Sequence, residues 1–176
     1  MHIPFKTVVS SIDEKENGCG TPEDLSLILA RGKASDVFAR TSGAWTLGAD
    51  TVVVIDGQIL GKPAGSRDAR LMLESLSGRE HRVITGFCLL DPEGAVCHSE
   101  TVTTMVRLKE LETDEIDLYI RSGEPFGKAG SYAIQGLGSF MVEGISGSYT
   151  NVVGLPLCAL IKALLTSGAL EKFPLS

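Results

Sequence analysis

Asp50 is the residue of this sequence whose position most strongly suggests chemistry. It follows Leu47 and Ala49 and precedes Val52-Val53-Val54, so a carboxylate interrupts an apolar segment that is typical of a strand. Burying a carboxylate without a partner is costly. Asp50 is therefore either a functional group or an aspartate at a strand kink beside Gly48, hydrogen-bonded to the backbone. The residues alone leave both interpretations open.

Other acids and several lysines could act with Asp50 on a phosphate compound. Asp13 and Glu14 offer hard oxygen ligands for Mg²⁺, which needs only one or two protein carboxylates when substrate phosphates and water complete its octahedron. Lys33, Lys62 and Lys128 each lie beside a glycine or proline and could contact phosphate. The alternative is that the acids are solvated loop charges and the lysines are surface residues with extended stems.

Two further polar residues have narrower interpretations. Gln135, in Ala133-Ile134-Gln135-Gly136, carries an amide that can donate and accept, as the recognition of a base edge requires, although a buried, satisfied amide fits equally. His81 is interpreted as structural, because no cysteine or serine nucleophile has a motif to pair with it. The four cysteines have no CxxC spacing and are expected to be reduced core residues (Cys19, Cys88, Cys97 and Cys158).

Composition and missing motifs exclude several classes of protein. The sequence has no GxxxxGK[ST] phosphate loop, no GxGxxG after a strand, no HExxH and no GxSxG. A net charge of −6 argues against a nucleic-acid surface, while a few converging lysines could still hold a small anion. No apolar run approaches the roughly 20 residues of a membrane span. We expect a cytoplasmic protein that binds neither nucleic acid nor membrane.

Helices interleaved with hairpins predict an α/β fold. The 176 residues are enough for one domain with its own core. The sheet should be mixed and twisted, flanked by helices, because two connections are too short for a helical crossover. Two lobes around a central cleft would suit this order. The expected helices cover 21–38, 66–77, 113–120 and a segment opening at Pro156, and the expected hairpins cover 46–60 and 82–108.

Local signals support these elements. Thr21 should cap the first helix, and Asp56-Gly57 should form the turn of the first hairpin. The residues expected to face inward are Leu25, Ile28 and Leu29 in the first helix, Ala69, Met72, Leu73 and Leu76 in the second, and Ile116, Tyr119 and Ile120 in the third.

Several ordered segments resemble the Maf family of nucleotide pyrophosphatases. They occur in the family's order from about residue 3 to about residue 165, which makes chance agreement implausible. The segments are Gly48-Ala49-Asp50-Thr51-Val52-Val53, Gly61-Lys62-Pro63, Leu76-Ser77-Gly78 with His81 and Val83, Lys128-Ala129-Gly130, Ile134-Gln135-Gly136, Gly147-Ser148-Tyr149 and Val153-Gly154-Leu155-Pro156-Leu157.

The resemblance implies a fold like that of inosine triphosphate pyrophosphatase and hydrolysis of a nucleoside triphosphate to the monophosphate and pyrophosphate. It implies that Asp50 is the general base, and that Asp50 and Glu14, with Asp13 as a further candidate, lie at a divalent metal, Mg²⁺ or Mn²⁺. Lys33 and Lys62 match family lysines, and Lys128 precedes the Ala-Gly pair.

The same resemblance implies a substrate class. Ile-Gln-Gly after Lys-Ala-Gly, together with threonine after the catalytic aspartate, is similar to the dTTP/UTP branch rather than to the branch acting on 7-methyl-GTP. Gln135 and Thr51 are therefore the expected specificity residues.

The sequence also departs from the family pattern. The family's Ser-x-Ser-Pro-Arg-Arg motif is absent, and residues 1–5 align with the segment after the family's first helix. We expect residues 1–176 to form one Maf-like domain that is shorter than the family by roughly 20 residues, either because the start was assigned at an internal methionine or because the chain is a truncated variant. Lost arginine–phosphate pairs predict weaker activity, and an open strand edge predicts self-association, as a homodimer. Gly127 stands where the family has an acid.

Two other functions are compatible with these residues. One is a catalytically impaired nucleotide-binding protein with a regulatory role in cell division, which would bind dTTP without releasing pyrophosphate. The other is a structural or interaction domain whose acids and lysines form surface ion pairs, in which case no nucleotide would raise the melting temperature.

Overall fold

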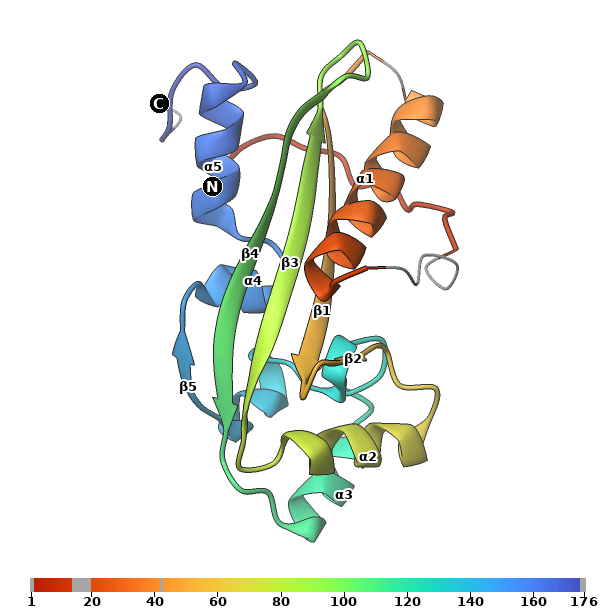
Figure 1. The fold of residues 1–176 in the computed structure, drawn as a ribbon, viewed down its shortest axis with the longest axis vertical. Coiled ribbons are helices and arrows are strands. Elements are labelled where there is room, and N and C mark those ends of the chain that lie inside the picture. Colours follow the sequence, from red (N-terminus) through yellow and green to blue (C-terminus); the bar gives the residue numbers. More distant parts are fainter. Residues whose placement is uncertain (1, 14–19, 42, 175–176) are drawn as a thin grey trace. The chain divides into compact units, whose positions relative to one another are not determined.

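The computed structural model of the chain describes residues 2–13, 20–41 and 43–174, and Figure 1 shows their arrangement. Its longer elements agree with the predicted order of helices and hairpins. In chain order the elements are α1 (Pro22–Thr41), β1 (Thr46–Ile55), β2 (Gln58–Leu60), α2 (Ser66–Leu76), β3 (Glu80–Leu90), β4 (Val96–Leu108), α3 (Thr113–Arg121), the short 3₁₀ helices η1 (Ala129–Ser131) and η2 (Gly136–Met141), β5 (Val142–Ser146), α4 (Tyr149–Val153) and α5 (Leu157–Thr166).

The five strands form one sheet in the order β2-β1-β3-β4-β5. β1 and β2 are the predicted hairpin, and its turn residues Asp56 and Gly57 have φ values of 51° and 77°, as a tight hairpin turn requires. The arrows of β1, β3 and β4 alternate in direction in Figure 1, and β5 is antiparallel to β4. The α/β class with flanking helices is confirmed. The sheet is antiparallel where a mixed one was predicted, because the chain turns back at α2 instead of crossing over the sheet.

Two compact units divide the chain. Unit 1 comprises Met1–Asp50, Thr85–Val102 and Leu155–Ser176, and unit 2 comprises Thr51–Ile84 and Thr103–Gly154. The long strands β1, β3 and β4 contribute residues to both. The single-domain organisation and the central cleft stay predictions.

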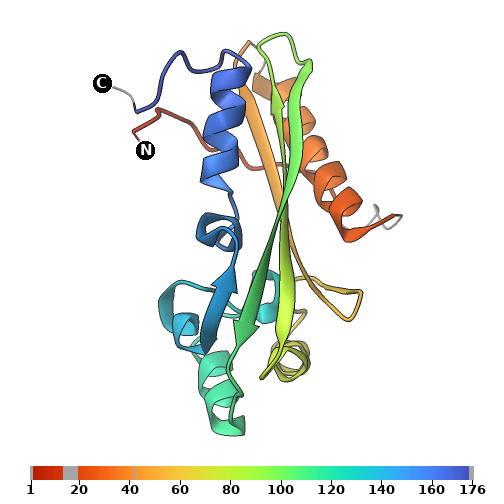
Figure 2. The same ribbon diagram turned by 60° about the vertical axis from the view of Figure 1, so that its left-hand side comes forward.

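In unit 1, strand β3 is covered on both faces. Phe87 packs with Leu160 of α5, whereas Cys88 packs with Ala30 and Ala34 of α1. Successive side chains of a strand point to opposite faces, and Figure 2 shows α1 and α5 on opposite sides of these strands. Burial of both faces explains why this segment is an almost continuous apolar run.

In unit 2, α2 and α3 supply the apolar faces that the spacing predicted. Ala69, Leu73 and Leu76 of α2 are fully buried. The expected inward residues of α3 are buried in the same cluster, namely Ile116, Tyr119 and Ile120. The helical periodicity was therefore sufficient to identify these faces.

The packed face of α1 differs from the prediction. Thr21 caps the helix as expected, since its Oγ1 accepts from the amide of Asp24 at 3.1 Å. Ile28, expected to face inward, is 45% exposed, and Ser26 is fully buried instead. The reason is a close backbone approach: a Cβ at Gly86 would lie 2.6 Å from the carbonyl oxygen of Ser26. Small residues therefore occupy most of the packed face of α1, namely Ser26, Ala30 and Ala34, and Leu29 is buried there as well.

The cysteine prediction was partly wrong. Cys88 is buried in the core of unit 1, but Cys97 and Cys158 are exposed. Apolar neighbours in the sequence did not indicate which face of each element these thiols occupy. Cys19 lies outside the described residues.

Candidate active site

An ion pair between α1 and β1 is the most suggestive arrangement in unit 1. Nζ of Lys33 lies 2.5 Å from Oδ1 of Asp50, and the two side chains are 22% and 10% exposed. Lys33 is thus the partner that the partly buried carboxylate of Asp50 requires. The contact joins two residues that the sequence assigned to separate roles, a phosphate contact and a base.

Close packing of the two backbones brings this pair together. A Cβ at Gly48 would lie 2.2 Å from the carbonyl oxygen of Ala30 and 2.7 Å from the amide nitrogen of Ala34. No side chain larger than hydrogen fits at that point of β1. Lys33 directly precedes Ala34, and Asp50 follows Gly48 by two residues, so the contact point fixes both ends of the ion pair.

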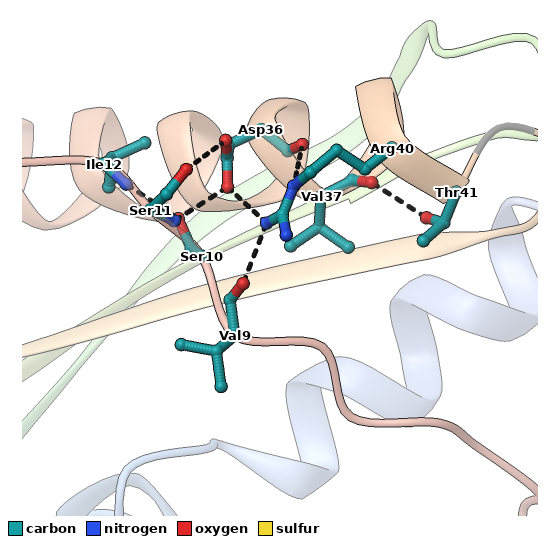
Figure 3. Close-up of polar contacts among 8 residues, drawn as sticks. All are labelled: Val9, Ser10, Ser11, Ile12, Asp36, Val37, Arg40 and Thr41. Carbon is teal, nitrogen blue, oxygen red and sulfur yellow. Dashed lines mark hydrogen bonds and ion pairs between the residues drawn. The ribbon is translucent and has the colours of Figure 1, made fainter.

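The segment before α1 is tied to the same helix (Figure 3). The amide and the hydroxyl of Ser11 donate to the Asp36 carboxylate at 2.9 and 2.8 Å. Arg40 donates to the carbonyl oxygen of Val9 at 2.8 Å and to the same carboxylate at 2.6 Å. These hydrogen bonds, those from Ser11 first, lower the pKa of Asp36 to about 2. We call residues 9–12 with Asp36 and Arg40 the strap.

The strap ends directly before the predicted acidic pair. Asp13 is exposed, and it takes part in polar interactions of its own. Glu14, the predicted metal ligand, lies outside the described residues. Its position relative to Asp50 therefore stays a prediction.

In unit 2, two lysine-bearing segments lie side by side. The amide of Gly130 donates to the carbonyl oxygen of Gly61 at 3.1 Å, which joins Gly61-Lys62-Pro63 to Lys128-Ala129-Gly130. Gly130 has a φ of 68°, and a Cβ there would lie 2.9 Å from Cγ1 of Val53 in β1. Lys62 is exposed and Lys128 is half-buried. The predicted phosphate-binding lysines of this unit thus belong to adjacent segments.

The two expected specificity residues also belong to unit 2. Thr51 is half-buried on β1, and a Cβ at Gly154 would lie 3.8 Å from its Oγ1. Gln135 is exposed and immediately precedes η2. The predicted site residues are therefore divided between the units, with Asp13, Lys33 and Asp50 in unit 1 and Thr51, Lys62, Lys128 and Gln135 in unit 2. Their assembly around one substrate stays a prediction.

Sequence reasoning did not identify the partners in two polar centres of unit 2, one at His81, which was interpreted as structural, and one at Glu124. Nε2 of His81 lies 2.7 Å from the hydroxyl of Tyr132, and burial lowers the pKa of His81 to about 4. Glu124 accepts hydrogen bonds from the amides of Leu137 and Gly138 at 2.9 and 2.8 Å. No local pattern marks either centre, because the partners are 13, 14 and 51 residues away in the sequence.

The asparagine of α4 was also missed. Asn151 is fully buried, and its amide nitrogen donates to the carbonyl oxygen of Val83 at 3.0 Å and to Oγ1 of Thr104 at 2.9 Å. Ser148 caps this short helix by accepting from the amide of Asn151. The helix follows a glycine-dense stretch, where periodicity gives no signal. The Gly147-Ser148-Tyr149 segment of the family resemblance is the one feature that pointed to it.

The described residues hold no preformed metal centre. Within residues 2–13, 20–41 and 43–174, no three His, Cys, Asp or Glu side chains gather closely enough to hold an ion. Mg²⁺ is commonly bound by one or two carboxylates plus substrate phosphates and water. Asp50 offers such a carboxylate.

In the described part of the chain, no helix combines the length and hydropathy that a membrane crossing requires.

Comparisons with known proteins agree with the family resemblance. A dTTP/UTP pyrophosphatase of Geotalea uraniireducens is 48% identical over 169 residues, which cover 96% of this chain and 87% of that protein. One of Geobacter metallireducens is 49% identical over 170 residues, covering 96% and 88%, and one of Syntrophotalea carbinolica is 48% identical over 173 residues, covering 97% and 79%. The profile of the family described as Maf-like protein matches residues 1–167. The chain therefore belongs to the Maf family.

Proposed function

We propose that this chain hydrolyses dTTP and UTP to the nucleoside monophosphate and pyrophosphate. The observation that carries the proposal is 48% identity, over 96% of the chain, to a protein named for dTTP/UTP pyrophosphatase activity. The Lys33–Asp50 pair supports it, because it supplies a carboxylate and a cation at one place. These are the groups that hydrolysis of a phosphoanhydride needs.

Asp50 is the proposed general base. A base must be ionised, and an ammonium 2.5 Å away favours the charged form of a carboxylate. In the proposed reaction the oxygen of a water molecule bonds to the α-phosphorus while its proton passes to Asp50. The bond from the α-phosphorus to the bridging oxygen breaks, and pyrophosphate leaves with the electron pair of that bond.

The lysines are the proposed phosphate contacts. Lys33 carries three donors, so it can bridge Asp50 and a phosphate oxygen at once. Lys62 and Lys128 belong to the two segments joined by the Gly61–Gly130 hydrogen bond. Phosphoryl transfer is accelerated mainly by positioning and by charge neutralisation, and these residues would supply both.

Asp50 and Glu14 are the proposed ligands of a divalent cation, Mg²⁺ or Mn²⁺, with Asp13 as a further candidate. Such a cation would supply positive charge at the phosphate oxygens. Thr51 and Gln135 are the proposed contacts to the nucleoside, because a hydroxyl and an amide can each donate and accept. The location in the cytoplasm, the homodimer and the assembly of both units as one Maf-like domain are further proposals.

The decisive experiment measures pyrophosphate release from dTTP, UTP, CTP and 7-methyl-GTP with Mg²⁺, together with the melting temperature in each nucleotide. Release from dTTP and UTP in preference to the other two is expected. A higher melting temperature without release would favour a nucleotide-binding protein that lacks catalysis. Neither release nor a shift would contradict the proposed function.

A further inference from the structure

We propose that Glu124 and Tyr119 are positioning residues that set the nucleobase preference by fixing the loop that carries Gln135. We call residues 133–138 the base loop. This inference rests on the proposed function, since Gln135 is a proposed contact to the nucleoside there, and its amide is suited to a base edge. It adds two residues that no motif of the sequence singled out.

The Glu124 carboxylate organises the second half of the base loop. Its Oε2 accepts from the amide of Leu137 at 2.9 Å, and its Oε1 accepts from the amide of Gly138 at 2.8 Å. These amides, that of Gly138 first, hold the pKa of Glu124 below its ordinary value. Two amides on one carboxylate fix the backbone that directly follows Gln135.

The Tyr119 hydroxyl organises the first half of the loop. It accepts from the amide of Ala133 at 3.2 Å and donates to Oε1 of Glu124 at 3.1 Å. The side chain of Tyr119 is only 3% exposed, because it belongs to the core of unit 2. The loop is therefore held on both sides of Gln135 and connected through Tyr119 to α3.

Two glycines of the base loop lie against the oxygens of Glu124 and Tyr119. A Cβ at Gly136, whose φ is 71°, would lie 2.6 Å from Oε2 of Glu124. A Cβ at Gly138 would lie 2.4 Å from the carbonyl oxygen of Ala133 and 2.7 Å from the Tyr119 hydroxyl. Both glycines leave room for the oxygens of Glu124 and Tyr119, so the geometry of the loop matches these two side chains.

The same glutamate also holds a proposed phosphate contact. Nζ of Lys128 donates to the backbone carbonyl oxygen of Glu124 at 2.8 Å. One residue thus orients the lysine with its backbone and the base loop with its side chain. Substitution of the side chain should disturb the loop and leave the lysine contact in place.

A carboxylate is required at position 124 because both oxygens accept hydrogen bonds. Glutamine has the same shape, but its NH₂ group would face an amide donor of Leu137 or Gly138. Tyr119→Phe removes the hydroxyl and keeps the ring in the core. We expect both variants to shift the base loop and to leave Asp50 and Lys33, in unit 1, unchanged.

The test compares Glu124→Gln, Tyr119→Phe and the control Glu143→Gln. Glu143 belongs to the same unit, is exposed and pairs with Arg107 at 2.8 Å, so its variant also removes a carboxylate with a partner. Steady-state kinetics with dTTP and CTP are measured for each. The exchange rates of the Leu137 and Gly138 amides are followed by NMR, which does not depend on activity.

We expect Glu124→Gln to raise KM for dTTP about tenfold, to change kcat less than about threefold, and to lower the preference for dTTP over CTP about tenfold, as expected for one lost charge-assisted contact. Both amides should exchange faster. Tyr119→Phe should change the same quantities by a smaller factor, and Glu143→Gln should match the wild type.

Faster amide exchange with an unchanged preference for dTTP would show that Glu124 is only structural and would overturn the inference, while wild-type turnover would still support the proposed function. A fall in kcat with constant KM would also overturn it. A wild-type chain that releases no pyrophosphate would contradict the proposed function, and this inference with it.

Discussion

The two units hold their candidate residues in different ways. In unit 1, Lys33 and Asp50 come from a helix and a strand whose backbones are in direct contact. In unit 2, Lys62, Lys128 and Gln135 lie in or beside loops, and the segments that carry them are connected by hydrogen bonds of backbone groups. Packing positions the proposed chemistry, and hydrogen-bonded loops position the proposed substrate contacts. Substitutions in unit 1 should therefore act on kcat, and those in unit 2 on KM and on local stability.

The largest effect is expected from Asp50→Asn. The amide keeps the size of the side chain but cannot accept a proton from water, so kcat for pyrophosphate release should fall about 10³-fold. The melting temperature should change little. The control is Asp56→Asn, which removes an exposed carboxylate 2.7 Å from Arg79 in a turn that asparagine also tolerates. More than about a tenth of the activity remaining in Asp50→Asn would exclude Asp50 as the base.

The next largest effect is the pH dependence of stability that we expect from the buried His81 of unit 2. The ordinary pKa of histidine is 6.5, and burial lowers that of His81 to about 4. Between these values the unfolded chain binds a proton that the native chain does not, so the free energy of unfolding decreases as the pH falls. The expected loss is about 2 kcal/mol between pH 7.5 and pH 5.

Urea unfolding at several pH values measures this loss. His81→Gln should lack this contribution, because glutamine does not titrate. Equal pH dependence in the wild type and in the variant would show that His81 is not held neutral in the native state. It would also contradict a buried hydrogen bond between His81 and Tyr132 in unit 2.

Local patterns of the sequence were sufficient to predict the long helices and strands. The cap at Thr21, the turn at Asp56-Gly57 and the apolar spacing of α2 and α3 act within a few residues, so they could be read directly. The prediction for Ile28 was wrong because a tertiary contact determines which face of α1 is buried. In this contact the glycine backbones of β1 and β3 approach the helix. Hydropathy alone does not contain that information.

The candidate site was predictable only through family resemblance. The residue types left Asp50 undecided between a base and a structural aspartate, and the contact with Lys33 joins residues 17 positions apart. The supports of the site were not predictable, because Glu124 and Tyr119 act through backbone amides that have no signature in the sequence. A search for contacts between side chains alone would not identify their hydrogen bonds to the backbone amides of residues 133, 137 and 138.

A smaller effect should come from Gly130→Ala, which tests how the lysine segments of unit 2 are joined. Alanine is strained at a φ of 68°, and its Cβ would meet Val53 at 2.9 Å. We expect a loss of about 1–2 kcal/mol in the free energy of unfolding. Gly61→Ala is the matched control at the other end of the hydrogen bond, since a Cβ there meets nothing within 4 Å. Equal losses in both variants would contradict this account.

The smallest effect is expected from the strap of unit 1. Asp36 is ionised far below neutral pH, since its pKa is about 2, so its contacts with Ser11 are present above its ordinary value of 3.8 and are lost as the pH falls towards 2. Asp36→Asn removes one acceptor for Ser11 and the charge that pairs with Arg40. Because the partners of Asp36, Ser11 and Arg40, are exposed, the melting temperature should not change measurably.

A local measurement is therefore required. The Ser11 amide should exchange about tenfold faster in Asp36→Asn, and kcat/KM at limiting Mg²⁺ should fall about twofold, because the strap leads directly to the predicted acidic pair. Asp91→Asn is the control, since Asp91 accepts the amides of Glu93 and Ala95 in a hairpin of the same unit. Faster exchange with unchanged Mg²⁺ dependence would mean that the acids at 13 and 14 do not need the strap. The positioning of the proposed chemistry would then depend on the contact of α1 with β1 alone.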